Sequence, residues 1–357
     1  MDIKSSKISL NSSRNPSEAL KKLVQGQGLG FEEMADFVEG MILGRVDEAK
    51  MAAFLAAMSL KGPSKEEILG AVQVFQTYAL KVETPPYPLM DTCGTGGKAY
   101  TTLNISTLSA FVAASFGLRV AKHGNRSFRG LLGSAQILEH FGVNVDLKPK
   151  KALKVLSEVG ITFFLASSYH PAMQAIKDLR AKLPFRTLFN LLGPLTNPLP
   201  LAYQVVGVYD SSYLDLFVEC LRALGRQSAA VVFGEDGQDE LSLSAASDLC
   251  VLDRDGRVEK FRVYPEDFGL QRAPKGSLLM KTQAEQLHAF REVLEGRPSP
   301  WLDAVALNAG LALFIGGVAH SVKEGVQMAK EALISKSPLR VFERFQEASK
   351  SHGTLSS

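Results

Sequence analysis

Residues 89–124 read LMDTCGTGGKAYTTLNISTLSAFVAASFGLRVAKHG, and this stretch decides the fold class. A short apolar run at 89–93 leads into a glycine-rich turn, a helix-like segment follows at 108–117, and a second short apolar run ends in AKHG. A strand, a helix and a strand in this order predict a βαβ unit with parallel strands. Short apolar runs recur at ITFFLA, YQVVGVYD, AAVVFG and DLCVLD, separated by helical segments. We therefore expect an α/β fold with a mostly parallel central sheet.

The residues before position 84 show a different pattern. Apolar residues recur at helical spacing in SEALKKLVQ, FEEMADFVEGMILG, EAKMAAFLAAMSLKG and KEEILGAVQVFQTYAL, each bounded by Gly, Ser or Pro. The run Thr84-Pro85-Pro86-Tyr87-Pro88 cannot continue a helix, because proline lacks the N–H group and restricts the residue before it. These segments predict a small helical domain that ends at a proline-rich linker.

Composition narrows the class of protein. A chain of 357 residues with 46% hydrophobic residues can bury a sizeable core, which excludes disorder as its main state. A net charge of +3 argues only weakly for nucleic acid or an anionic membrane as the main partner. The polar N-terminus lacks the apolar core of a signal peptide, so we expect a cytoplasmic enzyme. Cys93, Cys220 and Cys250 are odd in number and far apart, so they indicate neither a disulfide framework nor a zinc site.

The uncharged stretch at 304–322 is long enough to raise the question of a membrane span. It contains the polar residues Asn308, His320 and Ser321, and the chain has no second segment of this kind. We expect a buried helix that ends at the Gly316-Gly317 pair.

The turn Asp91-Thr92-Cys93-Gly94-Thr95-Gly96-Gly97-Lys98 follows a predicted strand and precedes 101–107, which opens a helix. Glycines let the backbone approach a ligand closely, and the free N–H groups of a helix start favour anions. The turn fits neither G-x-x-x-x-G-K-[ST] nor G-x-G-x-x-G. It is thus either a phosphate cradle of another kind or a plain connection between strand and helix.

Two further segments carry candidate chemistry. Residues 122–127 place a cation, an imidazole and an amide at the carboxyl edge of the sheet, where ligands bind in open α/β folds. Asp239-Glu240 follows the apolar run AAVVF, and carboxylates in such a loop suit Mg²⁺, which binds few protein oxygens together with substrate phosphates. The plainer alternatives are solvated loop side chains and an acidic surface turn.

Taken in order, DTCGTGG, NIST, AKHGNRS, GSAQILEHFGV, YHPAMQAIKDLR, RTLFNLLGPLTNPL, DELS and ALNAGLAL resemble the anthranilate phosphoribosyltransferases, of the nucleoside phosphorylase-like phosphoribosyltransferase group. The resemblance implies a small helical domain and a larger α/β domain with the active site in the cleft between them. It implies a helical domain at residues 1–84, to which helices from about 170–195 also belong. The α/β domain would comprise residues 85–169 and 196–357. The resemblance further implies a homodimer formed through the helical domain.

The reaction implied is the transfer of the phosphoribosyl group of phosphoribosyl pyrophosphate (PRPP) to anthranilate with Mg²⁺, in tryptophan biosynthesis. The PRPP site would be lined by Gly94, Gly97, Thr102, Asn104, Ile105, Ser106, Thr107, Lys122, His123, Gly124, Asn125, Arg126 and Ser134, with Lys98, Arg129 and Gly130 in the same loops. Anthranilate would be held by Gly94, Asn125 and Arg180, the last on a helix beginning near His170-Pro171, and Mg²⁺ by Ser106, Asp239 and Glu240. No acid or base catalyst is assigned.

Three departures from the family pattern involve four residues. Lys98 stands where the glycine-rich turn normally ends in Asp, Arg129-Gly130 replaces a usual Ser-Ser pair, and Gln136 replaces a usual Asp. One hypothesis is that Lys98 and Arg129 take over charge neutralisation from a second Mg²⁺.

Two alternatives to the anthranilate reaction stay open. The first is a diverged paralogue that acts on another amine or on a nucleoside. The second is a nucleic-acid-binding protein on the same scaffold, in which Lys98, Arg119, Lys122, Arg126 and Arg129 would meet backbone phosphates.

Overall fold

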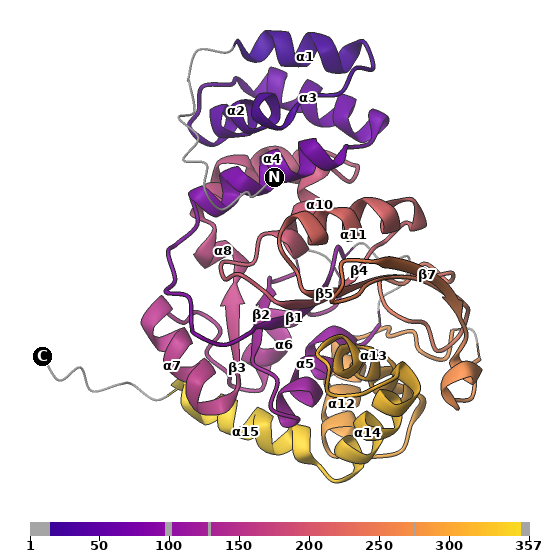
Figure 1. The fold of residues 1–357 in the computed structure, drawn as a ribbon. Coiled ribbons are helices and arrows are strands. Elements are labelled where there is room, and N and C mark those ends of the chain that lie inside the picture. The colour runs from indigo at the N-terminus through magenta and orange to yellow at the C-terminus, as the bar shows by residue number, and fades with distance from the viewer. Residues whose placement is uncertain (1–14, 97–101, 128–129, 275, 351–357) are drawn as a thin grey trace, which may run out of the picture.

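The computed structural model of the chain describes residues 15–96, 102–127, 130–274 and 276–350. Within residues 15–96, four helices gather at one end of the molecule (Figure 1). Their bounds are α1 Pro16–Val24, α2 Phe31–Ile42, α3 Glu48–Lys61 and α4 Lys65–Thr77. Asn15, Asp47 and Ser64 cap α1, α3 and α4 by accepting backbone N–H groups of the first turn. The predicted N-terminal helical domain is confirmed.

The described residues form one sheet of seven strands in the order β3-β2-β1-β4-β5-β6-β7. The strands are β1 Met90–Gly94, β2 Val120–Gly124, β3 Ile161–Leu165, β4 Tyr203–Gly207, β5 Ser228–Gly234, β6 Ser247–Leu252 and β7 Val258–Val263. Strands β1 to β5 are parallel, whereas β6 and β7 pair antiparallel at one edge. The mostly parallel sheet is as predicted.

The strand order reverses at β1. From β1 the chain builds outward through β2 and β3 on one side, and through β4, β5 and the antiparallel pair on the other. Strands β1 and β4 are therefore neighbours at the switch point, and their last residues, Gly94 and Gly207, lie opposite each other. In open α/β sheets this crevice at the carboxyl ends of the strands is where ligands bind.

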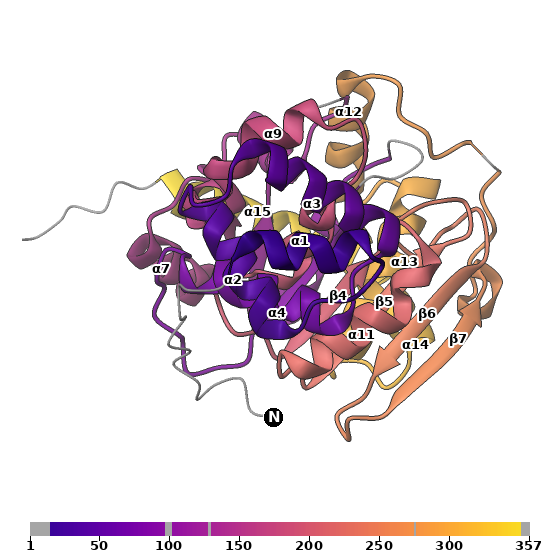
Figure 2. The same ribbon diagram turned by 90° about the horizontal axis from the view of Figure 1, so that it is seen from above.

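Helices cover both faces of the sheet (Figures 1 and 2). Helix α11 packs on β5 and β6 and also contacts α4, which joins the helical domain to that face. On the opposite face, α5 packs on β1 and α13 on β4. The remaining bounds are α5 Ile105–Ser115, α6 Ser134–His140, α7 Pro149–Val159, α8 Ala166–Tyr169, η1 Pro171–Ile176, α9 Lys177–Lys182, α10 Leu188–Leu192, η2 Gly193–Leu195, η3 Ser211–Tyr213, α11 Leu214–Ala223, η4 Pro265–Phe268, α12 Gln283–Leu294, α13 Pro300–Ile315, α14 Val322–Ile334 and α15 Ser337–Lys350.

The segment at 170–195 packs against the N-terminal helices. The short helix η1 contacts α2, and α10 contacts α3 and α4. Ile176 and Leu188 are buried in the same apolar core as Met34 and Phe75. The helix expected to begin near Pro171 is instead a 3₁₀ turn, η1, followed by α9, because the backbone of Ile176 (φ −111°, ψ 0°) departs from helical geometry between them.

The uncharged stretch near the C-terminus forms the buried helix that was predicted. Helix α13 ends at Ile315 with Gly316 as its C-cap, and Asn308 in its middle is buried. Across the described residues, no helix combines the length and the hydropathy needed to cross a membrane.

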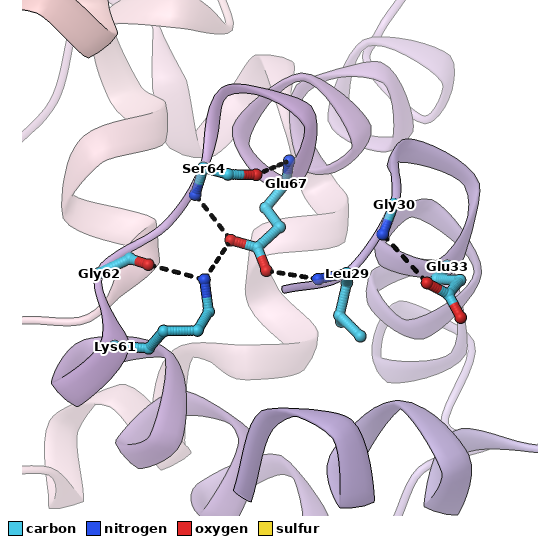
Figure 3. Close-up of polar contacts among 7 residues, drawn as sticks. All are labelled: Leu29, Gly30, Glu33, Lys61, Gly62, Ser64 and Glu67. Atoms are coloured by element: carbon cyan, nitrogen blue, oxygen red, sulfur yellow. Dashed lines mark hydrogen bonds and ion pairs between the residues drawn. The ribbon is translucent and has the colours of Figure 1, made fainter. Parts of the chain in front are cut away.

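Inside the helical domain, a fully buried carboxylate connects three segments (Figure 3). Glu67 Oε1 accepts the backbone N–H of Leu29 at 2.8 Å, and Oε2 accepts that of Ser64 at 2.6 Å. The Lys61 ammonium lies 2.8 Å from Oε2 and also donates to the Gly62 carbonyl. The ion pair of Glu67 and Lys61 thus joins the start of α2 to the turn between α3 and α4. One cation and two backbone N–H donors compensate the negative charge of Glu67.

Candidate active site at the switch point of the sheet

The glycine-rich turn and the acidic pair, distant in sequence, meet at the switch point. A Cβ atom at Gly94 would lie 2.2 Å from Asp239 Oδ2, and one at Gly207 would lie 1.5 Å from the Asp239 carbonyl oxygen. The backbone N–H of Gly96 donates to Asp239 Oδ2 at 2.9 Å. Glycine at both strand ends therefore lets the Asp239 loop close over β1 and β4.

The second carboxylate of the pair lies at the start of α5. Glu240 Oε1 accepts the backbone N–H of Ser106 at 3.2 Å, and the N-terminus of a helix favours negative charge. Asp239 and Glu240 are 4% and 6% exposed, which excludes the alternative of an acidic surface turn. Thr92 Oγ1 donates to the Ser106 carbonyl at 2.8 Å and ties β1 to the same helix start.

The loop of the acidic pair is held from α13. Asn308 Oδ1 accepts the N–H of Leu241 at 2.9 Å, and Asn308 Nδ2 donates to the carbonyl oxygens of Leu241 and Ala304, both at 3.0 Å. The side chain thus binds both backbone groups of the residue that follows Glu240. Sequence reasoning assigned Asn308 no role, because it lies within an apolar helix.

Lys122, in the middle of β2, lies inside the sheet. It is 3% exposed, and its ammonium donates to the Thr92 carbonyl at 2.6 Å. Burial lowers its pKa, and the neighbouring Asp91, Cys93 and Glu240 act in the opposite direction. The predicted cation is therefore present at the site, but it is directed at the backbone of β1.

The imidazole of His123 is neutral. Burial, together with the nearby His170 ring, 5.2 Å away between centroids, lowers the pKa of His123 to about 3. His123 Nδ1 lies 3.2 Å from the Gly193 carbonyl, so the neutral tautomer that donates from Nδ1 fits this contact. These contacts link β2 to the segment at 170–195.

Asp91 is fully buried beneath the glycine-rich turn. Its oxygens accept the backbone N–H of His123 at 3.3 Å and the Asn197 amide at 3.1 Å. Burial raises its pKa to about 6, and the Lys122 charge is the main opposing influence. Asp91 therefore anchors β2 and the loop after α10 to β1.

The loop between β2 and α6 is organised by its own side chains. Asn125 Oδ1 accepts the N–H of Arg126 at 2.9 Å, and Arg126 forms an ion pair with Glu139. Ser134 Oγ donates to the Asn125 carbonyl at 3.3 Å. Gln136, a departure from the family pattern, accepts the N–H groups of Ser127 and Gly133 at 2.8 and 2.9 Å through one oxygen. An amide oxygen serves this loop cap, so the usual Asp is not needed for it.

Of the other predicted PRPP residues, some lie at the start of α5 or in the loop before α6, and the rest lie outside the described residues. Thr102, Asn104, Ile105 and Thr107 lie at the start of α5, where all but Asn104 are buried, and Gly130 adopts φ +75° in the loop before α6. Asn104 Nδ2 donates to the Leu132 carbonyl at 3.1 Å, which ties that helix start to that loop. Gly97, Lys98 and Arg129 lie outside the described residues.

Arg180 lies apart from the sheet edge, on α9. Its guanidinium carbon lies 5.7 Å from the centre of the Phe189 ring, and burial lowers its pKa without removing its charge. Among the described residues, no carboxylate forms an ion pair with it. A half-buried guanidinium without an acidic partner is suited to a carboxylate ligand.

The cations invoked for nucleic-acid binding are engaged within the protein. Lys122 is buried against Thr92, Arg126 pairs with Glu139, and Arg119 donates to the Leu156 and Ser157 carbonyls. Lys98 and Arg129 lie outside the described residues. Within the described part of the chain these side chains do not form a basic groove for backbone phosphates, which weighs against that alternative.

Comparison with known proteins decides the family. Residues 17–79 match the helical bundle domain of a glycosyl transferase family, and residues 86–337 match its a/b domain. A protein named anthranilate phosphoribosyltransferase from Methanobrevibacter smithii is 38% identical over 330 residues, which cover 92% of this chain and 98% of that protein. The chain belongs to the anthranilate phosphoribosyltransferase family.

Other anthranilate phosphoribosyltransferases agree in sequence and in fold. The Acidithiobacillus ferrooxidans protein of that name is 42% identical over 318 residues, covering 89% of this chain and 94% of its own. The crystal structure of the Thermus thermophilus enzyme superposes with a TM-score of 0.86 at 36% identity, over 93% of this chain and 99% of that one. The Saccharomyces cerevisiae enzyme in complex with PRPP and Mg has the same fold, with a TM-score of 0.86 at 24% identity.

Proposed function

We propose that this chain transfers the phosphoribosyl group of PRPP to the amine of anthranilate, giving N-(5-phosphoribosyl)anthranilate and pyrophosphate, a step of tryptophan biosynthesis. The observation that carries the proposal is the buried pair Asp239-Glu240, which sits over the glycine-rich turn and the start of α5 at the switch point. Carboxylates beside the N-terminus of a helix suit a metal-bound polyphosphate. The named relatives, alike over both domains, support the choice of acceptor.

The PRPP site proposed here consists of two segments at the switch point. The first is the glycine-rich turn with the start of α5, residues 94–107, whose N–H groups favour anions. The second is the loop from Lys122 to Ser134, which includes Asn125 and Arg126. A hydrogen bond from Asn104 Nδ2 to the Leu132 carbonyl holds the two segments together.

Mg²⁺ fits the donor set at this site. Asp239, Glu240 and the hydroxyl of Ser106 offer hard oxygen ligands, and the described residues hold no cluster of three or more His, Cys, Asp or Glu. A metal with few protein ligands leaves coordination positions for substrate phosphates. When bound, Mg²⁺ would neutralise charge that develops on the departing pyrophosphate. We further propose that Lys98 and Arg129 neutralise charge in place of a second Mg²⁺. Activity should then saturate at a low Mg²⁺ concentration. A requirement for two Mg²⁺ ions in binding titrations would contradict this proposal.

The chemistry needs positioning more than proton transfer. The bond between the anthranilate nitrogen and ribose C1 forms as the bond between C1 and the pyrophosphate oxygen breaks, and pyrophosphate leaves with the electron pair. The proton lost from nitrogen passes to solvent. An aromatic amine is already neutral, so no strong general base is required, and alignment of the nitrogen with C1 is the main task. His123, neutral at pH 7, adds no positive charge here.

We propose that Arg180 recognises the anthranilate carboxylate, together with Asn125 and Gly94. The planar guanidinium can bind both oxygens of a carboxylate, and Arg180 has no acidic partner among the described residues. Its helix packs with the helical domain, whereas the PRPP segments belong to the sheet. The two substrates would then meet between the domains, near the contacts of His123 with His170 and Gly193.

The test is to mix the protein with PRPP, Mg²⁺ and anthranilate and to follow the loss of anthranilate fluorescence. Arg180→Ala should raise the KM for anthranilate by about 10- to 100-fold, since a charged hydrogen-bonding partner is lost. Lys177→Ala, an exposed cation on the same helix, is the matched control and should leave it unchanged. No turnover by folded protein across a range of Mg²⁺ would favour a paralogue with another amine or a nucleoside as substrate.

A homodimer formed through the helical domain is also proposed. The resemblance to the family supports this proposal, and Leu60 on α3 (91% exposed) and Val24 at the end of α1 (72% exposed) offer apolar side chains to a partner. Sedimentation equilibrium of the wild type should give twice the mass of one chain. The Leu60→Asp variant should give the mass of a single chain.

A further inference from the structure

One side chain from outside the proposed PRPP segments joins them to each other. Gln286 lies on α12 and is 1% exposed. Its Oε1 accepts the N–H of Leu132 at 2.9 Å, and its Nε2 donates to the Leu132 carbonyl at 3.0 Å and to Asn104 Oδ1 at 2.6 Å. All the hydrogen atoms of its amide, and its oxygen, are therefore engaged with two segments that are not adjacent in sequence.

The network is closed, which fixes its geometry. Asn104 Nδ2 donates to the Leu132 carbonyl, so Asn104, Gln286 and Leu132 each bond to the other two. Turning the Gln286 amide over would set its NH₂ group against the Leu132 N–H, two donors facing each other. Turning the Asn104 amide over would set its NH₂ group against the Gln286 NH₂ group, again two donors facing each other. Both side chains are thus held in one orientation, with Gln286 buried and Asn104 partly exposed.

The two segments joined in this way are those assigned to PRPP. Asn104 is the N-cap of α5, immediately before the N–H groups of Ile105 and Ser106. Leu132 lies between Gly130 and Ser134 in the loop after β2. Helix α12 contributes none of the residues proposed to touch substrate, so Gln286 acts on the site only through these contacts.

We infer that Gln286 is a positioning residue that sets the affinity of the site for PRPP by holding the start of α5 and the loop 130–134 in one arrangement. This inference rests on the proposed function. Without the Gln286 amide, the Leu132 N–H and the Asn104 oxygen lose buried partners, and the two segments separate or reorient to reach water. PRPP must then restore the arrangement when it binds, and that cost weakens binding.

The inference predicts a specific kinetic pattern. Once PRPP is bound, the segments return to the arrangement of the wild type, and the reacting groups are the same. Loss of Gln286 should therefore raise the KM for PRPP with little change in kcat, the pattern of a lost binding interaction shared by ground and transition states. The KM for anthranilate should change little, because Arg180 lies on a different element.

The experiment measures binding of PRPP with Mg²⁺ by calorimetry without anthranilate, and then steady-state rates with both substrates. Gln286→Leu removes all three hydrogen bonds and should raise the Kd for PRPP by about 10- to 100-fold. The control is Gln73→Leu on α4 of the helical domain, where the glutamine amide donates to Thr77 of its own helix at 3.3 Å. The control should bind PRPP as the wild type does.

Gln286→Glu provides a second variant if Gln286→Leu does not fold. Its carboxylate can still accept the Leu132 N–H, but it also faces the Asn104 and Leu132 oxygens. PRPP binding should therefore weaken at pH 8. It should recover in part at pH 5, where a protonated carboxyl group can donate a hydrogen bond. Both variants binding PRPP like the wild type, with only a lower melting temperature, would overturn the inference. A wild type that does not bind PRPP would overturn the proposed function as well.

Discussion

At the scale of single residues, Gly94 and Gly207 face the same aspartate in different ways. A Cβ at Gly94 would meet the end of the Asp239 side chain, at 2.2 Å from Oδ2. A Cβ at Gly207 would meet the Asp239 backbone, at 1.5 Å from the carbonyl oxygen and 2.3 Å from the carbonyl carbon. A side chain can rotate away, whereas a backbone can move only with its loop. Substitution at these two positions should thus separate function from folding.

Gly94→Ala should damage activity more than stability. The displaced Asp239 carboxylate would lose its hydrogen bond from Gly96 and its place as a metal ligand, so we expect kcat/KM to fall by about 100-fold or more with only a small change in melting temperature. Steady-state rates over a range of Mg²⁺, with thermal unfolding in parallel, measure both effects.

Gly207→Ala should instead destabilise the fold by about 3 kcal/mol or more, because the loop backbone must move. Gly193→Ala is the control, since its Cβ would have no atom within 4 Å. Equal losses of stability in Gly94→Ala and Gly207→Ala would contradict this distinction.

His123 predicts a pH dependence of stability. Burial depresses its pKa to about 3 in the folded chain, from the usual value of 6.5. Between these values the unfolded chain binds a proton that the folded chain does not, so the stability contributed by His123 is present above pH 6.5 and is lost as the pH falls toward 3. Asp91 acts in the opposite direction, because its raised pKa, about 6, favours the folded state at low pH.

His123→Asn isolates the histidine contribution, since its amide can donate to the Gly193 carbonyl as Nδ1 does. Below pH 6.5 the wild type should lose stability relative to the variant by about 1.4 kcal/mol per pH unit. Urea unfolding of both proteins between pH 7 and 4 measures this difference. Parallel stability curves would show that His123 is free to take up a proton in the folded chain.

At the scale of elements, α13 supports the acidic pair from behind. Asn308 binds both backbone groups of Leu241, so the position of Glu240 depends on a helix that carries no ligand itself. We expect Asn308→Leu to raise the Mg²⁺ concentration for half-maximal rate by about 10-fold, the cost of leaving buried backbone groups unpaired. Asn308→Asp, which keeps the acceptor for Leu241 N–H, should have a smaller effect. A Mg²⁺ dependence identical to that of the wild type would disprove the role.

Helix α4 depends in a similar way on Glu67. This side chain is fully buried and accepts from Leu29, Ser64 and Lys61, so its replacement by glutamine sets an NH₂ group against a donor. Glu67→Gln should lower the free energy of unfolding by about 3 kcal/mol. Glu66→Gln, one residue earlier and half exposed, should have little effect. Urea unfolding of the two variants tests this, and similar midpoints would refute it.

The elements also show what sequence patterns can and cannot predict. The run at 89–124 predicted β1, α5 and β2, because strand and helix periodicities are local. The antiparallel strand β7 was not predicted, since VEKFRV is largely exposed and lacks an apolar face. Gln286 and Asn308 were not assigned roles, because a polar side chain in a helix shows no sign of which distant backbone it contacts. Lys122 was expected at the ligand edge, but only the coordinates place its ammonium on the Thr92 carbonyl.

At the scale of the whole molecule, the proposed site draws on both parts of the fold. The sheet would supply the phosphate and metal groups at its switch point, and the helical part with the segment 170–195 would supply Arg180. Each part alone would hold one substrate. On this proposal, transfer between PRPP and anthranilate would require the two parts together, and both the helical bundle and the a/b domain match the family.

The measurement that tests this account most directly is identification of the products by chromatography and mass spectrometry. The protein is incubated with PRPP, anthranilate and Mg²⁺, and pyrophosphate is quantified in the same samples. We expect N-(5-phosphoribosyl)anthranilate and one pyrophosphate for each anthranilate consumed. Unchanged anthranilate, with PRPP intact, hydrolysed or used on another acceptor, would contradict it.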